Sequence, residues 1–562
     1  MFIRDFETDK DLLGFCAKQS VYDFMGAHDC GAFVRFRFFA PEADAVYLVA
    51  SFNEWSDNTL MSRCGYDGVW EACVPREEMR VGDTYKYKLY VNGRVFYKTD
   101  PYARMATSFP YYNAVICDEA EYSWRDGVWL SRRAETYGQE NSNYPMHIYE
   151  IELCNWKRHD DGGFLSYTEL ADEIVPYLKQ MGYTHVLITG LFERCFDDQS
   201  QSETVEYYAP TSKHGTPQDF MRLVDHAHTC GIGVLLDWSI RKKDLTDENV
   251  KKLRLCGNNF ESYLLSNLIY WADKYHIDGI KTPSICPERA SFFHDIAWHM
   301  KELMPDFLMI ADGRGDFLKK LGFDIIFNNA WSDATMSYIE KDIDVRSVDD
   351  IVSYDTCCQG GLIAISDKHV LPGRKTLIGK MTGDYWRKFA GARATLAYQM
   401  MSRGKKLTVM GSEIGQYKEW GSEVEWHLLE YDNHAAFQLY CSDLNALYLK
   451  CPQLWYEDGE NNCCAPTKVS DNVICIKSCS CDGRELAAVI NFSYYTYENF
   501  CISVDRPGLW REIFNSDSKK YGGSGINNKE ASVLSYLTDS GEYALKITVP
   551  PLAVTVFECL VK

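Results

Sequence analysis

The chain has 562 residues, with 59 lysines and arginines against 80 aspartates and glutamates, a formal net charge of −21 at pH 7. At about 150 residues per domain this length predicts three or four domains, which excludes a single compact domain. Hydrophobic residues make up 46% of the chain and charged residues 25%, which excludes disorder as its main state. The acidic balance argues against nucleic acid as a partner, because a phosphate backbone requires a basic face, and it fits an uncharged substrate.

No segment of the sequence has the pattern of an export signal or a membrane span. Acidic residues interrupt the apolar runs of residues 1–20, and no uninterrupted apolar stretch reaches about 18 residues. The 21 cysteines include no C-x-x-C pair at zinc spacing, and no phosphate-binding or dinucleotide-binding glycine motif occurs. We therefore expect a cytoplasmic protein with reduced thiols, no metal, no cofactor and no membrane partner.

Residues 30–118 follow an N-terminal segment, 1–29, and predict a β-sandwich. Residues 33–39 (FVRFRFF) and 84–91 (TYKYKLYV) alternate in polarity with period two, which is typical of half-buried strands. The dipeptide Asn92-Gly93 directly after the second of these segments is a strong hairpin signal. Strands this short, separated by turns, indicate a sandwich.

The rest of the chain predicts a linker, a barrel and a second sandwich. A polar stretch predicts a linker over residues 119–145. From residue 146 onward, apolar strands alternate with amphipathic helical stretches, and eight such alternations predict a (β/α)8 TIM barrel over 146–450. Short strands return in residues 451–562, which predict a C-terminal all-β domain. The predicted barrel strands are 147–153, 185–189, 233–238, 277–282, 308–311, 324–327, 362–366 and 406–410.

Several long segments resemble the bacterial glycogen branching enzymes of the α-amylase superfamily (glycoside hydrolase family 13). Residues 206–220 (EYYAPTSKHGTPQDF) resemble the stretch between barrel strands 2 and 3 of those enzymes, and 231–238 (GIGVLLDW) resembles strand 3. Residues 379–389 (GKMTGDYWRKF) and 406–416 (KLTVMGSEIGQ) are similar to segments around strands 7 and 8. Residues 51–55 (SFNEW) resemble the family's glycogen-binding module. The resemblance implies the family's fold and a relation to enzymes that cut an α-1,4-glucan bond and transfer the chain to a 6-hydroxyl.

The resemblance also implies where the catalytic groups of a retaining enzyme would stand. Such an enzyme needs a nucleophile and an acid/base about 5 Å apart, at the carboxyl ends of barrel strands. In the segment 278–283 (DGIKTP), Pro283 takes the nucleophile position and Lys281 takes the position of the preceding arginine. Proline has no nucleophilic atom, and Ser284 would reach the groove only if the strand register slipped by one residue.

The other two carboxylate positions are changed as well. Asp312 takes the acid/base position with a side chain one methylene shorter than the family's glutamate, and is read either as a residual acid or as a helix cap. The third carboxylate position falls on Lys368, or on Asp367 if the alignment contains a one-residue gap. A lysine about 5 Å from a cationic transition state would raise its energy by about 3 kcal/mol at an effective dielectric constant of about 20.

Two supporting cleft positions differ from the family, while a third is kept. Asp237 follows strand 3 as the family has it, but Lys242 replaces a substrate-binding histidine, and Ser202 replaces a tyrosine that stacks on the sugar. These losses fall on one functional set, whereas the motifs that pack the fold remain. The pattern indicates a relaxed catalytic requirement on a retained structure.

Candidate glucan-binding residues lie in the N-terminal module. Trp55, Lys88 and Asn113 align with the module's stacking tryptophan, its hydroxyl-binding lysine and a polar contact, while its second stacking tryptophan aligns with Val95. The alternatives are that Trp55 is a core residue at the sandwich edge and that Lys88 belongs to a solvated strand face.

Three hypotheses for the function follow. The first is a catalytically silent relative that binds α-1,4-glucan or glycogen, and docks on it or on an active enzyme of glycogen metabolism. The second is an active branching enzyme or glucan hydrolase with a rebuilt site that uses Asp312 and Asp367, which as an inverting pair would be about 6.5–9.5 Å apart. The third is a non-carbohydrate scaffold in which side chains fill the old cleft.

Overall fold

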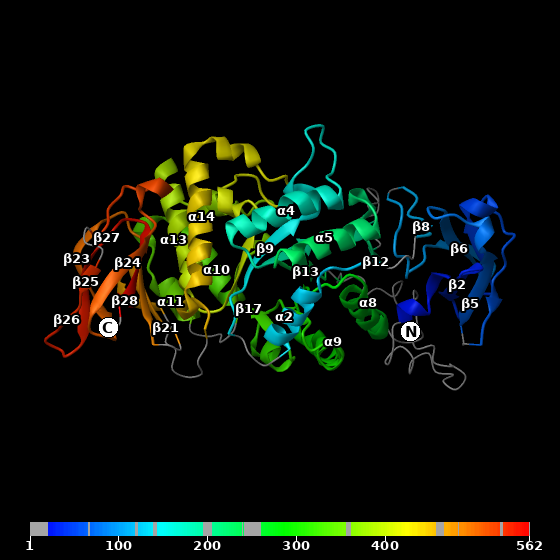
Figure 1. The fold of residues 1–562 in the computed structure, drawn as a ribbon, viewed down its shortest axis with the longest axis horizontal. Helices are drawn as coiled ribbons and strands as arrows, with labels where there is room; N and C mark the ends of the chain where they lie inside the picture. The colour runs from blue at the N-terminus through cyan, green and yellow to red at the C-terminus, as the bar shows by residue number, and fades with distance from the viewer. Residues whose placement is uncertain are drawn as a thin grey trace.

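The fold is a row of three parts: an N-terminal β-sandwich, a central barrel and a C-terminal all-β domain (Figure 1). The fold class predicted from the sequence is thereby confirmed. The structure is a computed structural model, and it describes residues 21–65, 68–108, 110–117, 122–138, 143–194, 205–238, 240, 260–355, 361–456, 466–480, 483–528 and 532–560.

Two sheets form the N-terminal sandwich, one in the order β1-β2-β5-β4 and the other in the order β3-β6-β7 with β8 paired to β6. The predicted alternation buries Phe36 and Phe38, and Phe38 stacks on Tyr87 with ring centroids 4.3 Å apart. Asn92 and Gly93 join β6 to β7 with φ values of 49° and 74°, the left-handed values that a type I′ hairpin requires. The strands are β1 Gly26–Asp29, β2 Phe33–Phe39, β3 Ala45–Ala50, β4 Ser62–Arg63, β5 Val69–Pro75, β6 Thr84–Val91, β7 Arg94–Lys98 and β8 Ala114–Val115.

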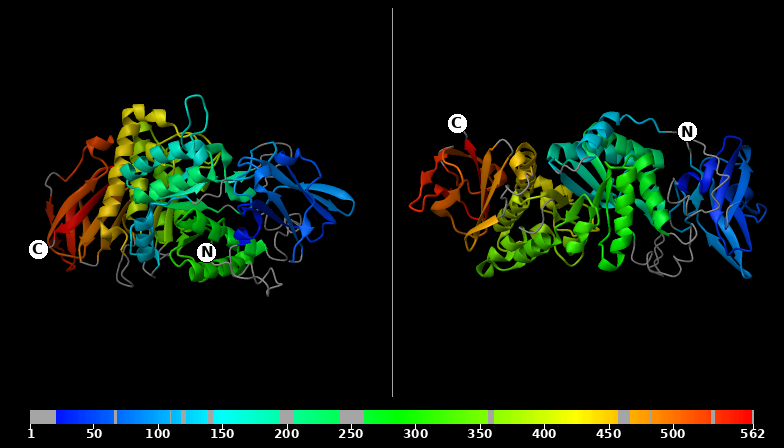
Figure 2. Two further views of the ribbon diagram at one scale, coloured as in Figure 1. Left: turned by 45° about the vertical axis from the view of Figure 1, so that its right-hand side comes forward. Right: turned by 90° about the horizontal axis from the view of Figure 1, so that it is seen from below.

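Eight parallel strands close into the predicted barrel in the order β9-β10-β13-β15-β16-β17-β18-β19, and β19 pairs back to β9 (Figure 2). The barrel strands are β9 His147–Glu152, β10 His185–Thr189, β13 Gly233–Asp237, β15 Gly279–Lys281, β16 Leu308–Ala311, β17 Ile325–Phe327, β18 Gly361–Ile365 and β19 Lys405–Val409. A hairpin of β11 Phe192–Arg194 and β12 Val205–Pro210 follows β10. The barrel helices are α3 Leu153–Trp156, α4 Tyr167–Met181, α5 Pro217–Thr229, α8 Phe260–Lys274, α9 Ala290–Leu303, α10 Asn329–Glu340, α11 Asp349–Asp355, α12 Leu377–Lys380, α13 Tyr385–Met401 and α14 Asp432–Lys450.

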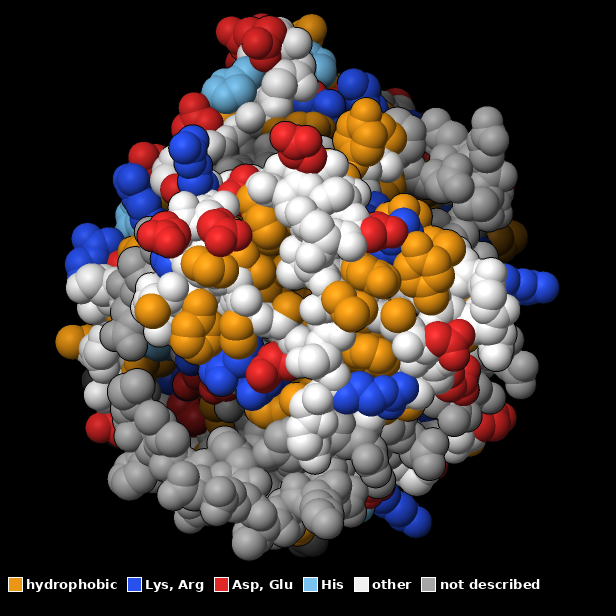
Figure 3. Space-filling model, turned by 90° about the vertical axis from the view of Figure 1, so that its right-hand side faces the viewer, with side chains coloured by type: hydrophobic (Ala, Val, Ile, Leu, Met, Phe, Trp, Pro, Cys, Tyr) orange, Lys and Arg blue, Asp and Glu red, His pale blue; other side chains and the backbone are white. Residues whose placement is uncertain are grey.

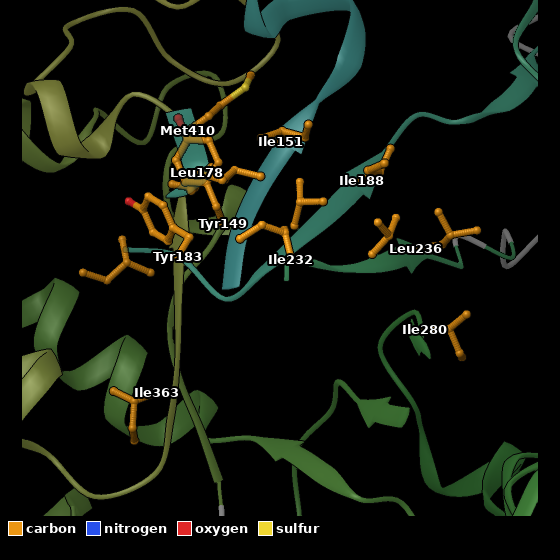
Figure 4. Packing of buried hydrophobic residues seen from close by; sticks show 14 of the residues in the cluster. Tyr149, Ile151, Leu178, Tyr183, Ile188, Ile232, Leu236, Ile280, Ile363 and Met410 are labelled. Carbon is orange, nitrogen blue, oxygen red and sulfur yellow. The ribbon is translucent and has the colours of Figure 1, made fainter. Parts of the chain in front are cut away.

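Successive residues of the barrel strands face two different cores. Leu235 and Ile310 belong to the cluster that fills the barrel interior. Ile151 and Leu236 belong to the larger cluster between the strands and the helices, which also contains Leu178 of α4 (Figure 4). Because side chains alternate with period two, the residue two positions after an interior residue also faces the barrel axis. By the same rule, the charged residues at the carboxyl ends of the strands face the barrel axis.

The segment predicted as a linker, residues 119–145, contains an α-helix, α2 (Gly127–Tyr137). Trp129 is the only described residue of this helix that is buried, so the helix lacks the apolar stripe that would have revealed it in the sequence. Its indole stacks on His228 of α5 with ring centroids 5.3 Å apart and donates a hydrogen bond to Asp278 at 2.8 Å. Tertiary contacts, and not its own periodicity, therefore hold α2 at the base of the barrel.

A buried charge network fastens α2 to the barrel. His228 Nδ1 lies 2.9 Å from Asp126, which directly precedes α2, and His228 Nε2 lies 2.9 Å from Asp278, which directly precedes β15. Burial alone would lower the pKa of His228, but Asp278 and Asp126 outweigh burial and raise this pKa to about 9. In turn, His228 and its neighbours hold the pKa values of Asp126 and Asp278 well below their usual range, against the effect of burial. An imidazolium between two carboxylates therefore links α2, α5 and β15.

Two further sheets form the C-terminal domain, in the orders β20-β21-β22-β28-β24-β25 and β23-β27-β26. On β22, Ala488 packs with the barrel core, while its neighbours Ala487 and Val489 pack between the two sheets. The strands are β20 Pro466–Ser470, β21 Val473–Cys479, β22 Glu485–Asn491, β23 Tyr497–Val504, β24 Leu509–Asn515, β25 Ser532–Leu534, β26 Tyr536–Leu537, β27 Tyr543–Val549 and β28 Ala553–Leu560. No helix in the described part of the chain has both the length and the apolar composition needed to cross a bilayer.

Candidate functional site

Charged residues face the barrel axis at the carboxyl ends of four strands. Glu150 lies on β9, Asp237 ends β13, Lys281 ends β15, and Asp312 directly follows β16. Asp237 and Asp312 each stand two positions after a residue of the interior core, so the alternation along the strand turns both side chains toward the axis. The active sites of TIM-barrel enzymes lie at the carboxyl ends of the strands. We therefore take these residues and the loops around them as the candidate site.

Lys281 is buried and lies at the centre of a group of carboxylates, of which Glu150 is also buried. Its Nζ donates a hydrogen bond to Glu150 at 2.9 Å, and it lies 3.7 Å from Asp367 and 3.9 Å from Asp237. The backbone N–H of Asp367 donates to the second oxygen of Glu150 at 2.8 Å. Burial alone would lower the pKa of Lys281, but the three carboxylates hold it well above its usual range, which favours the charged ammonium. Burial, together with the charge of Asp367, raises the pKa of Glu150 to about 7.

Asp312, at the acid/base position, is held as an ionised hydrogen-bond acceptor. Lys368 Nζ lies 3.1 Å from Asp312 Oδ1, and the amide of Asn329 donates to the same oxygen at 2.9 Å. Lys368 also donates to the Asn329 side chain. Although burial favours the protonated form, Lys368 and Asn329 outweigh it and lower the pKa of Asp312. A general acid must carry a proton when the sugar binds, and these contacts disfavour that proton.

Pro283 lies just beyond the end of β15, at the position where the resemblance places the nucleophile. The backbone around it is fixed: Thr282 N–H donates to Ile310 at 2.9 Å, and Ile285 N–H donates to Asp312 at 2.8 Å. Lys281 faces the barrel axis, and because side chains alternate along an extended backbone, Pro283 two positions later faces the axis as well. The neighbouring Ser284 is exposed to solvent. This register gives no support to the one-residue slip that would bring Ser284 into the groove.

The two candidates for the third carboxylate, Asp367 and Lys368, both reach the site. Asp367 faces Lys281, whereas Lys368 faces Asp312, so each carboxylate that a rebuilt mechanism would use is paired with a lysine. Lys368 Nζ also lies 4.8 Å from the centroid of the Phe327 ring at the end of β17. The sequence-predicted cleft residues Ser202 and Lys242 lie outside the described residues.

On the N-terminal module, an acidic residue close to Trp55 in the chain, Asp57, pairs with Lys88. Trp55 is 41% exposed and has a left-handed backbone with φ of 60°, which is not the conformation of an edge-strand core residue. Lys88 Nζ lies 2.6 Å from Asp57, two residues after Trp55, and the hydroxyl of Tyr90 donates to Asp57 at 3.1 Å. The hydrogen bond to Asp57 is the main cause that raises the pKa of Lys88 above its usual range.

An aromatic face surrounds this lysine. Tyr97 on β7 stands directly opposite Lys88 on β6, and Tyr47 on β3 stands on its other side. Tyr97 is 57% exposed, and its ring centroid lies 5.8 Å from Lys88 Nζ. Figure 3 shows the end of the molecule that carries the sandwich, where hydrophobic side chains are exposed in several places between charged ones. Asn113 is half-buried, and its backbone N–H donates to Thr107 at 2.9 Å.

Sequence reasoning missed Glu150, Asn329, Asp57 and Tyr97. Glu150 carried a signal, because it lies between Tyr149 and Ile151, and a carboxylate buried among apolar residues is costly unless it is paired. Tyr97 carried one too, since it stands two residues after Val95 and therefore faces the same side of β7. Asn329 and Asp57 carried none, because their partners, Lys368 and Lys88, lie more than 30 residues away in the chain.

The outer parts of the chain match two known domain families. Residues 24–103 match carbohydrate-binding module 48 (isoamylase N-terminal domain), and residues 468–559 match the α-amylase C-terminal all-β domain. Among solved structures, the fold is similar to a putative α-amylase from Salmonella typhimurium, with 17% identity, a TM-score of 0.65 and coverage of 95% and 99% of the two chains. It is also similar to a pullulanase from Paenibacillus barengoltzii, with 16% identity, a TM-score of 0.71 and coverage of 97% and 98%.

Curated relatives match over nearly the whole chain. The 1,4-α-glucan branching enzyme of Halothermothrix orenii is 32% identical, over 96% of each protein. Those of Desulfitobacterium hafniense, covering 93% of this chain and 92% of the relative, and of Aquifex aeolicus, covering 95% of each, are both 31% identical. With this identity across all three parts of the molecule, the chain belongs to the family of the bacterial 1,4-α-glucan branching enzymes.

Proposed function

We propose that this protein binds α-1,4-glucan but does not cut or transfer it. The observation that carries the proposal is the content of the candidate site: Pro283 stands where an attacking carboxylate is required, and Asp312 and Asp367 are each paired with a lysine. A retaining glycosidase needs a free nucleophile and a protonated acid near each other, and neither group is provided. The alternative of an inverting pair is disfavoured because both its carboxylates face ammonium groups, and an acid in such a pair would need a raised pKa.

The purified protein is expected to leave amylose unbranched. Loss of a covalent nucleophile removes about 10⁴-fold or more of catalysis, so the iodine-stain absorbance of amylose should stay constant while the Aquifex aeolicus relative lowers it. Asp312→Asn should change nothing, because Asp312 has no catalytic role in this proposal. A falling absorbance with new α-1,6 bonds, abolished by Asp312→Asn, would support the rebuilt site.

Glucan binding is proposed for the exposed face of the N-terminal module. Trp55→Ala is expected to weaken the binding of maltoheptaose about tenfold, since an aromatic contact is worth about 0.5–1.5 kcal/mol beyond its buried area. Isothermal titration calorimetry measures this, with Trp298→Ala as the control because Trp298 is 51% exposed on α9, away from the module. An unchanged affinity in Trp55→Ala would remove this face from the proposal, and a complete lack of heat with the wild-type protein would favour the non-carbohydrate scaffold.

We further propose that the protein lies in the cytoplasm, with glycogen and an active enzyme of glycogen metabolism as its partners. In support, Cys30, Cys73 and Cys501 are exposed free thiols, as expected in a reducing compartment.

A further inference from the structure

Next to the candidate site, a groove of about 450 Å³ opens between the loops that follow β18 and β19. Both loops leave the carboxyl ends of their strands, so the groove lies on the same barrel face as Asp367 and Lys368. Its volume falls within the range of small-ligand sites. Two aromatic rings and several polar groups line it, chiefly Tyr417, Trp420, Lys375, Lys418, Glu419 and Ser422.

Hydrogen bonds between the two loops hold the groove in shape. The Glu419 carboxylate accepts from the backbone N–H groups of Gly373 at 2.7 Å and Lys375 at 2.6 Å. The backbone N–H of Trp420 donates to the carbonyl of Val370 at 2.8 Å. Lys375 is held in a left-handed conformation with φ of 59°, which this clamp enforces. A ligand would therefore meet a groove that is already formed, which lowers the entropy cost of binding.

The groove offers the chemistry that a sugar chain uses. Tyr417 is 43% exposed and Trp420 is half-buried, and within the described chain neither the Tyr417 hydroxyl nor Trp420 Nε1 makes a hydrogen bond. The ammonium groups of Lys375 and Lys418 are exposed and form no ion pair with a described residue. Flat rings can stack on the apolar faces of glucose units, while these donors can reach sugar hydroxyls.

We infer that this groove is a second binding site for a neutral α-1,4-glucan chain, separate from the N-terminal module. The inference rests on the proposed glucan binding and adds to it a second binding site on the barrel. A neutral chain is favoured over a polyanion because Glu419 lies in the same lining and the whole protein carries a net charge of −21. The paired charges at Lys281 and Lys368 occupy the old catalytic centre, while this groove beside it stays open.

Titration calorimetry with maltoheptaose tests the inference in four variants. The wild-type protein should bind two chains. Trp55→Ala should weaken one of the two binding events about tenfold and leave the other unchanged, and adding Tyr417→Ala to Trp55→Ala should weaken that other binding about tenfold. Lys375→Gly should also weaken it in the Trp55→Ala background, and glycine suits the positive φ there, so the fold is preserved. Tyr495→Ala is the control, because Tyr495 is 73% exposed on the C-terminal domain.

The outcomes separate the two proposals. A single binding event that Trp55→Ala weakens and Tyr417→Ala leaves unchanged would overturn the second site and leave the proposed function standing. Binding at the groove seen only with a phosphorylated glucan, and not with maltoheptaose, would overturn the assignment to a neutral chain. No binding of any glucan by the wild-type protein would overturn the proposed function and the second site together.

Discussion

Replacing Lys281 by methionine is expected to lower the free energy of unfolding by about 3–5 kcal/mol at pH 8. The substitution removes the only cation that contacts Glu150 among the described residues and leaves that carboxylate buried next to Asp367. Removing one partner of a buried ion pair costs more than removing both, because the remaining charge has lost its water. Adding Glu150→Gln to Lys281→Met should therefore recover part of the loss.

The loss caused by Lys281→Met should also depend on pH. Glu150 has its folded-state pKa raised above the ordinary value of 4.5, so ionising it destabilises the fold as the pH rises through this range. Without Lys281 the folded-state pKa rises further, and the difference from the wild-type protein should grow from pH 5 to pH 8. Urea unfolding at both pH values measures it, with Lys546→Met as the control because Lys546 is exposed on β27. A loss below about 1 kcal/mol at both pH values would contradict the paired-charge account.

The second large effect is expected at the base of the barrel, where His228→Gln should remove about 3 kcal/mol of stability near pH 6. The pKa of His228 rises from an ordinary 6.5 to about 9 in the folded protein, and each unit corresponds to about 1.4 kcal/mol. A raised folded-state pKa means that this contribution is complete below pH 6.5 and is lost as the pH rises through 9. The wild-type protein should therefore lose stability between pH 6.5 and 9.5.

Thermal unfolding of the wild-type protein and His228→Gln across that pH range tests the network. The midpoints of the two proteins should differ most near pH 6 and converge toward pH 9.5. His294→Gln serves as the control, since His294 is exposed on α9 and, among the described residues, its neighbour Asp295 is its only ion-pair partner. Parallel curves for the wild-type protein and His228→Gln would show that His228 is not the titrating group.

The parts of the fold that could be predicted are those that depend on the local periodicity of the sequence. The alternation around Phe36 and Phe38, the Asn92-Gly93 turn and the run of apolar barrel strands each depend on neighbouring residues alone. Helix α2 could not be predicted, because a polar segment becomes a helix here through contacts of Trp129 and Asp126 with His228 and Asp278, about 100 to 150 residues away.

The candidate site divides in the same way. Pro283, Lys281 and Lys368 could be recognised from the sequence as departures from a family pattern, since each substitution is visible by itself. What they do in place of catalysis could not be predicted. The pairing of Lys281 with Glu150 joins residues that are 131 positions apart, and Lys368 reaches Asn329 and Asp312 across the barrel. Such pairings are set by the closing of the barrel, and no local pattern specifies them.

The most direct test of the central claim is the intact mass of the protein after incubation with a 5-fluoro-glycosyl fluoride of α-1,4-glucan configuration, which traps the covalent intermediate of retaining enzymes. With a prolyl ring in place of the attacking oxygen, the mass should remain that of the unmodified chain, while the Aquifex aeolicus relative gains one glycosyl group. A gain of one glycosyl group by this protein, mapped to a single side chain in the barrel, would contradict the account.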